Sequence, residues 1–82
     1  MASARVNLPD DLDGLMRSEI TRCIEEANLG ENDTLIAKRY LIDQWAQIDI
    51  AAEWGWTRST ISNRMPRIIK KVQMTAHKLG MT

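Results

Sequence analysis

Residues 47–65 read QIDIAAEWGWTRSTISNRM, and this stretch decides the fold class. Two short amphipathic segments flank Gly55, a residue type that tolerates the positive φ of a tight turn. The small Ala51 allows the two segments to approach closely, and Ile61 is placed to fill the angle between them. Together with the apolar Ile50, this spacing predicts a helix-turn-helix over residues 47–65.

The second helix of the predicted motif begins after Thr57, whose side chain suits the N-terminal cap. Its outward positions carry polar and basic side chains, and from these we expect base contacts in the major groove: Arg58, Ser59, Ser62 and Asn63. Phosphate contacts are expected from the helix start at Thr57 and from neighbouring polar side chains: Gln47, Arg67, Lys70 and Lys71. The alternative interpretation is an ordinary solvated helix face.

Arg64 follows Ile61 by three residues and therefore lies close to the inward side of the same helix. We expect a structural, partly buried ion pair between Arg64 and either Glu53 or Asp49, which would join the two helices of the motif. Removal of one partner would leave the other as a partly buried charge without an ionic partner. The tryptophans are expected to be core residues rather than base-stacking platforms: Trp45, Trp54 and Trp56.

Charge is strongly segregated along the chain, although the net charge is zero. Residues 1–53 carry five basic and eleven acidic side chains, a net −6, whereas residues 54–82 carry six basic and no acidic side chains, a net +6. A polyanion would be attracted to the C-terminal third and repelled by the rest. A dipolar solvated surface is the alternative, and the helix-turn-helix pattern favours binding of nucleic acid.

Apolar residues recur at helical spacing and no strand pattern occurs, which predicts an all-α fold of four to five helices in one domain, residues 1–82. Residues 1–7 are expected to form a flexible tail. The acidic segment 8–29 is expected to contain a helix over roughly 9–28. Pro9 is expected at its first position and Gly30 as its stop. Its inward stripe is expected to contain Leu12, Met16, Ile20, Ile24 and Ala27, with Cys23 alongside.

The next helix is expected to be capped by Asn32 or Asp33 and to end near Asp43 or Gln44, with an apolar face of Leu35, Ile36, Tyr40, Leu41 and Ile42. The first helix of the motif covers about residues 47–54. The second carries an inward stripe of Ile61, Met65, Ile68, Ile69 and Val72. Pro66 removes a backbone hydrogen bond there at a cost of roughly 3 kcal/mol, which predicts a kink or break at 65–66. A C-terminal helix over 66–79 would follow, ended by Gly80.

Several classes of function receive no support from the sequence. No apolar run is long enough to span a membrane, and the N-terminus has no apolar stretch of signal-peptide length. The single Cys23 cannot form an internal disulfide, which agrees with a cytoplasmic location. His77 has no second ligand at metal spacing, so neither a metal nor another cofactor is expected. No nucleophilic triad or glycine-rich phosphate loop can be assembled, so we do not expect an enzyme.

The segment from Leu29 to Val72 resembles region 4 of the bacterial sigma-70 family of initiation factors, and the stand-alone phage and bacterial regulators built on it. The resemblance rests on three groups of residues: Leu35, Ile36 and Tyr40; Gln47, Ile50, Ala51 and Glu53; and Gly55, Thr57, Ser59, Thr60, Ile61, Arg64 and Arg67. In that family the arginine matching Arg64 is often structural. The chain departs from the family at Trp54 and Trp56, which replace smaller aliphatic residues, and at Pro66, where the family runs an unbroken helix.

The resemblance implies a small, sequence-specific regulator of transcription that binds double-stranded DNA. It also implies a phage or mobile-element origin, the cytoplasm of a bacterial or phage-infected cell, and RNA polymerase as a candidate partner. A homodimer is a further candidate, because paired half-sites raise specificity. Two alternatives stay open: a DNA-packaging or recombination accessory factor similar to terminase small subunits, and an RNA polymerase-interacting module with a degenerate helix-turn-helix.

Overall fold

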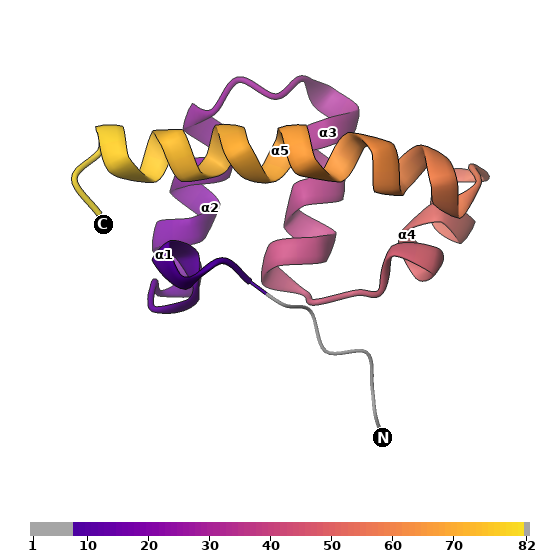
Figure 1. Cartoon of the computed structure of the whole chain (residues 1–82), viewed down its shortest axis with the longest axis horizontal. Helices are drawn as coiled ribbons and strands as arrows, with labels where there is room; N and C mark the ends of the chain where they lie inside the picture. The colour runs from indigo at the N-terminus through magenta and orange to yellow at the C-terminus, as the bar shows by residue number, and fades with distance from the viewer. Residues whose placement is uncertain (1–7, 82) are drawn as a thin grey trace.

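One long helix, α5 (Arg58–Lys78), organises the fold (Figure 1). The computed structural model describes residues 8–81. α5 runs crosswise over α2 (Arg17–Glu26) and α3 (Glu31–Ala37), and α4 (Gln47–Trp54) meets it near its N-terminal end. The buried side chains of α5 recur at three- and four-residue spacing and form one continuous apolar stripe: Ile61, Met65, Ile68, Val72 and Ala76.

Two helices, α1 (Asp10–Asp13) and α2, take the place of the single acidic helix expected over residues 9–28. α1 ends at Asp13, and its C-cap, Gly14, is a poor helix former. The backbone of Met16 is extended, with ψ 158°, and its N–H donates to the Glu19 carboxylate at 2.8 Å, which starts α2. The expectation for Met16 is therefore wrong: its side chain is 64% exposed instead of belonging to the inward stripe.

The connection from α2 to α3 also differs from the expectation that Gly30 ends the first helix. α2 ends at Glu26, and Asn28 adopts a left-handed backbone conformation with φ 55°. Gly30, at φ 94°, instead precedes the first residue of α3, Glu31. Neither Asn32 nor Asp33 provides the predicted cap, since no side-chain cap bond forms at the start of α3. Carboxylates in the first turn of α3 favour this start through the helix dipole.

α3 continues directly into a π-helical stretch, η1 (Lys38–Ile42), which the sequence did not predict. The helical path ends with Asp43 as its C-cap, as expected. Gln44 then turns the chain at φ 57°, and the N–H of Trp45 donates to the Arg39 carbonyl at 2.9 Å. Most of the expected apolar face is buried or half-buried, but Leu35 is 46% exposed.

Helices are the only regular elements within residues 8–81, which confirms the all-α prediction for that part of the chain. None of these helices combines the length and the apolar character needed to cross a membrane. The predicted flexible tail, residues 1–7, lies outside the described residues. The tryptophans are half-buried and pack against the margin of the aliphatic core rather than at its centre: Trp45, Trp54 and Trp56.

α5 runs without interruption through Pro66, so the break predicted at 65–66 and the separate helix over 66–79 are wrong. Pro66 is exposed, while the buried stripe continues through Met65 and Ile68 on either side of it. Proline costs a helix roughly 3 kcal/mol. Burial of each large aliphatic side chain contributes about 1.5–3 kcal/mol, so several of them together outweigh that cost. Leu79 is the C-cap of α5, and Gly80 follows at φ 73°.

The substitution Pro66→Ala is expected to raise the free energy of unfolding by about 1–3 kcal/mol, because it restores the backbone hydrogen bond to the Ser62 carbonyl and removes the ring clash. Since α5 is already continuous, helix content measured by circular dichroism should not change. Urea denaturation measures the stability, and Lys70→Ala on the same helix is the control, expected within about 0.5 kcal/mol of wild type. A clear gain in helix content for Pro66→Ala would mean that proline breaks the helix in solution.

Candidate nucleic-acid interface

The candidate interface is built on the corner between α4 and α5. α4 ends at Trp54, and Gly55 adopts the left-handed conformation with φ 70°, as the sequence predicted. The N–H of Trp56 donates to the Ala51 carbonyl at 2.9 Å and closes the turn. A residue with a Cβ atom at position 55 would add roughly 1–2 kcal/mol of steric cost, so glycine determines the direction in which α5 leaves α4.

Apolar residues fill the angle between the two helices. Ile50, Ala51 and Ile61 are all buried, in agreement with the structural role expected of them. Thr57 caps α5, because its Oγ1 accepts a hydrogen bond from the Thr60 N–H at 3.3 Å. The corner is therefore held by packing on one side and by a capped helix start on the other.

The side of α5 opposite the buried stripe is exposed. Its members recur at three- and four-residue spacing and are called here the outward stripe: Ser59, Asn63, Pro66, Arg67 and Lys70. Arg58, in the first turn, is exposed as well. No acidic residue follows Glu53 in the sequence, so no carboxylate of α5 itself opposes a bound anion.

Ser62 and Gln47 face each other across the corner. The Ser62 hydroxyl donates to Gln47 Oε1 at 2.6 Å, and both residues are half-buried. The sequence assigned Ser62 to a base edge and Gln47 to a phosphate. In the structure their hydrogen bond ties the start of α4 to the second turn of α5, and Ser62 lies beside the outward stripe rather than on it.

Arg64 pairs with Asp33, so the predicted pair with Glu53 or Asp49 is wrong. Arg64 Nη1 lies 2.6 Å from Asp33 Oδ1, and the guanidinium carbon lies 4.8 Å from the centroid of the Trp56 ring. The side chain therefore joins α5 to α3 and to the turn before α5. Sequence reasoning missed Asp33 because it lies 31 positions away from Arg64 and in another helix.

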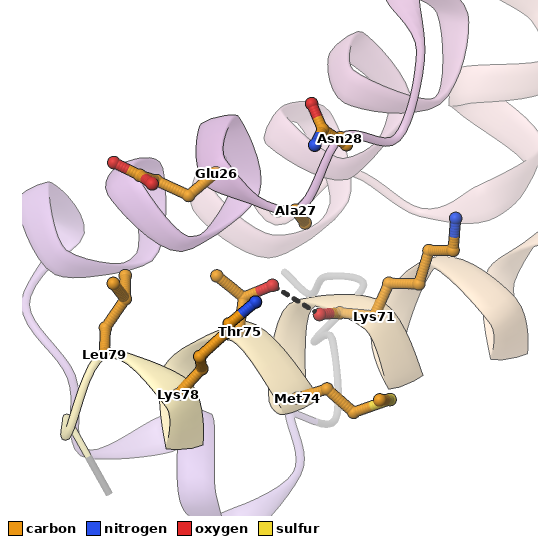
Figure 2. Close-up of a pocket in the computed structure, with 8 residues that line it drawn as sticks. All are labelled: Glu26, Ala27, Asn28, Lys71, Met74, Thr75, Lys78 and Leu79. Carbon is orange, nitrogen blue, oxygen red and sulfur yellow. Dashed lines mark hydrogen bonds between the residues drawn. The ribbon is translucent and has the colours of Figure 1, made fainter.

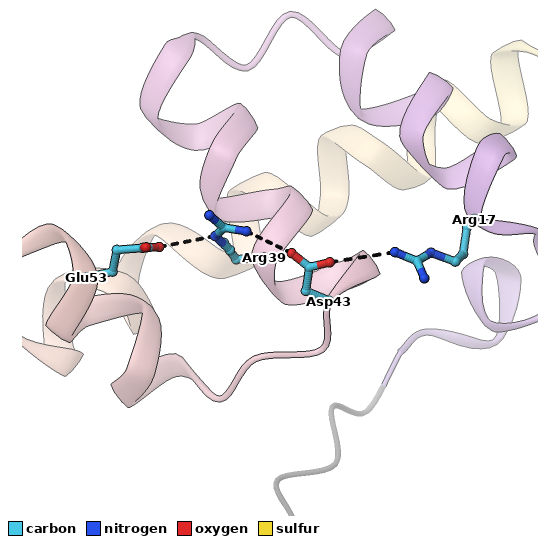
Figure 3. A network of polar contacts seen from close by, with 4 residues as sticks. All are labelled: Arg17, Arg39, Asp43 and Glu53. Atoms are coloured by element: carbon cyan, nitrogen blue, oxygen red, sulfur yellow. Dashed lines mark hydrogen bonds and ion pairs between the residues drawn. The ribbon is translucent and has the colours of Figure 1, made fainter.

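A polar network lies on the side of the molecule away from α5 (Figure 3). Arg39 Nε donates to Glu53 at 3.2 Å and Nη1 donates to Asp43 at 3.0 Å, while Arg17 lies 3.7 Å from the other Asp43 oxygen. The hydrogen bonds that Arg39 donates, first to Asp43 and then to Glu53, raise the pKa of Arg39 above its ordinary value. The Arg39 guanidinium carbon also lies 4.7 Å from the Trp45 ring centroid. The network links α2, η1 and α4.

The basic side chains divide into two groups by their ionic partners. Each described arginine or lysine outside α5 lies within ion-pair distance of a carboxylate: Arg17, Arg22, Lys38 and Arg39. On α5, Arg64 has such a partner. Within residues 8–81, the remaining arginines and lysines of α5 form no ion pair: Arg58, Arg67, Lys70, Lys71 and Lys78. Within residues 8–81, the positive charge that has no carboxylate partner is therefore concentrated on this one helix.

Other chemically reactive side chains are engaged in structure. Cys23 is buried, and this burial, followed by the charge of Glu19, raises the pKa of its thiol and disfavours the nucleophilic thiolate. His77 Nε2 lies 3.3 Å from an Asp11 carboxylate oxygen. In the part of the chain that the structure describes, no group of three or more His, Cys, Asp and Glu side chains could hold a metal ion.

Comparison of the chain with family models, curated proteins and solved structures gives no match. A function is therefore inferred from three features of the molecule itself. These are the corner between α4 and α5, the exposed outward stripe, and the cations of α5 that have no ionic partner within residues 8–81.

The substitution Arg64→Ala is expected to lower the free energy of unfolding by about 1–2 kcal/mol, because it removes both the ion pair with Asp33 and the contact with the Trp56 ring. The Arg64 side chain is 42% exposed, so the ion pair alone should contribute no more than about 1 kcal/mol. A double-mutant cycle with Asp33→Asn, followed by urea denaturation, isolates that contribution.

The matched cycle combines Arg64→Ala with Glu53→Gln and should give a coupling energy near zero, since Glu53 pairs with Arg39. Coupling of Arg64 to Glu53 in place of Asp33 would contradict the geometry described here.

Proposed function

We propose that the chain binds double-stranded DNA through α5, as a sequence-specific regulator of transcription whose α4–α5 corner works as a helix-turn-helix. One observation carries the proposal: the outward stripe is exposed and is flanked by cations that have no ionic partner within residues 8–81. The major groove admits an α-helix, and base edges and phosphates there offer hydrogen-bond partners for such side chains.

Base recognition is assigned to the N-terminal half of α5. Asn63 lies on the outward stripe one turn after Ser59, and Arg58 is exposed in the first turn. Asparagine bonds adenine through two hydrogen bonds, and arginine does the same with guanine. Ser62 contributes through its bond to Gln47, which sets the position of α5 against α4.

Phosphate contacts are assigned to Arg67 and Lys70, which continue the outward stripe, and to the amide groups at the helix start after Thr57. Because carboxylates outnumber cations in residues 1–53, the rest of the molecule repels a polyanion. Attraction at one helix combined with repulsion elsewhere favours a single orientation on the duplex. The resemblance to sigma-70 region 4 that we inferred from the sequence pattern of residues 29–72 further leads us to propose transcription as the process, a phage or mobile element as the origin, and RNA polymerase as a second partner.

A protein-interaction module is the second candidate, and exposed apolar residues on the acidic part of the chain favour it. Ile48 is 61% exposed beside Asp49 at the start of α4, and Leu35 is 46% exposed on α3. Such residues suit contact with another protein. DNA affinity that barely changes with salt would favour this candidate, because phosphate contacts release counterions and make affinity salt-dependent.

The double substitution Arg58→Ala and Asn63→Ala is expected to reduce the preference for the cognate site over a random duplex by about 5-fold or more for each lost base contact, since such contacts contribute about 1–3 kcal/mol. Selection from random DNA defines the site, and fluorescence anisotropy measures the affinities. Arg22→Ala with Asn32→Ala removes the same residue types from exposed positions outside α5 and should leave the preference unchanged. Equal preference in both double variants would remove the base-contact assignments.

The double substitution Arg67→Ala and Lys70→Ala is expected to weaken binding to every duplex by a similar factor. It should also reduce the slope of log affinity against log salt by about 2, because two phosphate contacts are lost. Arg17→Ala with Lys38→Ala is the control, since both of those cations pair with carboxylates. The same slope in the Arg67/Lys70 variant and in wild type would contradict these phosphate contacts.

A further inference from the structure

A groove of about 420 Å³ lies between the C-terminal end of α2 and the C-terminal half of α5 (Figure 2). Half-buried Ala27 and Leu79 supply apolar surface within it. Glu26 lies on the α2 side, and Lys71 and Lys78 lie on the α5 side. The groove therefore offers a carboxylate on one edge, ammonium groups on the other, and apolar surface between them.

The charged groups of the groove are available to another molecule. Lys71 and Lys78 form no ion pair within residues 8–81. Glu26 has Arg22 at 3.8 Å, but both side chains are more than half exposed, so this pair is weak. Met74 also borders the groove, and its side chain is 62% exposed. One patch thus contains both signs of charge and a flexible apolar side chain.

We propose that this groove is the interface between two copies of the chain related by a two-fold axis. In such an isologous contact the same patch of each copy faces itself. Glu26 of each copy faces Lys71 and Lys78 of the other copy, and Met74 of each copy enters the apolar part of the opposite groove. Met side chains suit this role because they adapt to irregular surfaces.

The mixed charge favours a second copy over a nucleic acid in this groove. A phosphate backbone would meet the carboxylate of Glu26 together with the lysines, and the carboxylate would repel it. A surface that carries both signs is complemented by its own two-fold mate. The outward stripe, in contrast, contains no carboxylate at all.

The groove and the base-reading residues lie at different ends of α5. By the rise of an α-helix, α5 is about 31 Å long. A dimer joined through the C-terminal halves therefore leaves both N-terminal halves, with Arg58 and Asn63, exposed. Binding of the dimer to two paired DNA half-sites rests on the proposed function. Once one copy binds its half-site, the other copy is held close to the second half-site, and this high effective concentration strengthens its binding. Self-association itself does not depend on DNA.

Sedimentation equilibrium of the DNA-free chain, over a concentration series at low salt, should show a reversible monomer–dimer equilibrium. Raised salt should shift it toward monomer, because the pairs across the interface are partly exposed and are screened. The variant Glu26→Lys and the double variant Lys71→Glu, Lys78→Glu each place like charges across the axis, and each is expected to be monomeric. An equimolar mixture of the two restores opposite charges at both contacts and should form a heterodimer about as readily as wild type dimerises.

Arg67→Glu with Lys70→Glu is the matched control, since it reverses two charges on the same helix but on the outward stripe. It should dimerise like wild type while losing DNA binding, so the interface and the DNA contacts are tested separately. Circular dichroism checks that every variant keeps its helix content. A monomeric wild type, groove variants that dimerise like wild type, or a mixture that stays monomeric would each overturn the proposal. In those cases a lower salt dependence of DNA affinity in the Lys71/Lys78 variant would assign these lysines to phosphate instead.

Discussion

Burial of one face of α5 is the constraint on which the rest of the structure depends. α1, α2, α3 and α4 all contact this helix, and the stripe around Ile68 gives them a shared surface. The same burial keeps the helix continuous through Pro66. Because side chains on opposite faces of a helix point in opposite directions, packing Ile68 inside places Asn63 and Lys70 outside. Exposure of the outward stripe therefore follows from how the core is packed.

Local chemistry explains what could be predicted of the fold. Helix periodicity, the cap at Thr57 and the positive φ at Gly55 each depend on a few neighbouring residues, and all three agree with the structure. The continuity of α5 through Pro66 depends on packing between elements, whereas the break before Met16 has a local cause that the apolar period hides. Met16 fits the apolar period of its segment, yet the N–H to carboxylate bond with Glu19 starts a new helix at that point.

In the candidate site, too, features set by nearby residues could be predicted and features set by packing between helices could not. Periodicity places Ser59 and Asn63 away from the core, and both residues are exposed. Arg58 lies three residues before the buried Ile61, and it is exposed because it stands in the first turn of α5. Periodicity does not say which neighbour stands beside a side chain at the flank of the helix. Arg64 finds its partner 31 positions away, and Ser62 finds its partner 15 positions away. Those pairings depend on how α3 and α4 dock against α5. The apolar pattern of a single helix does not predict this docking.

The unbroken course of α5 has a consequence for how the chain tolerates change in length. α5 contributes to three surfaces: the buried stripe, the outward stripe and the wall of the groove. Each residue of an α-helix turns its successor by about 100° and advances it by about 1.5 Å. A one-residue insertion or deletion between Asn63 and Met74 would rotate everything beyond it out of phase. A change of length in this segment would therefore misplace the buried stripe, the outward stripe and the groove wall at once, whereas a single substitution affects one surface only.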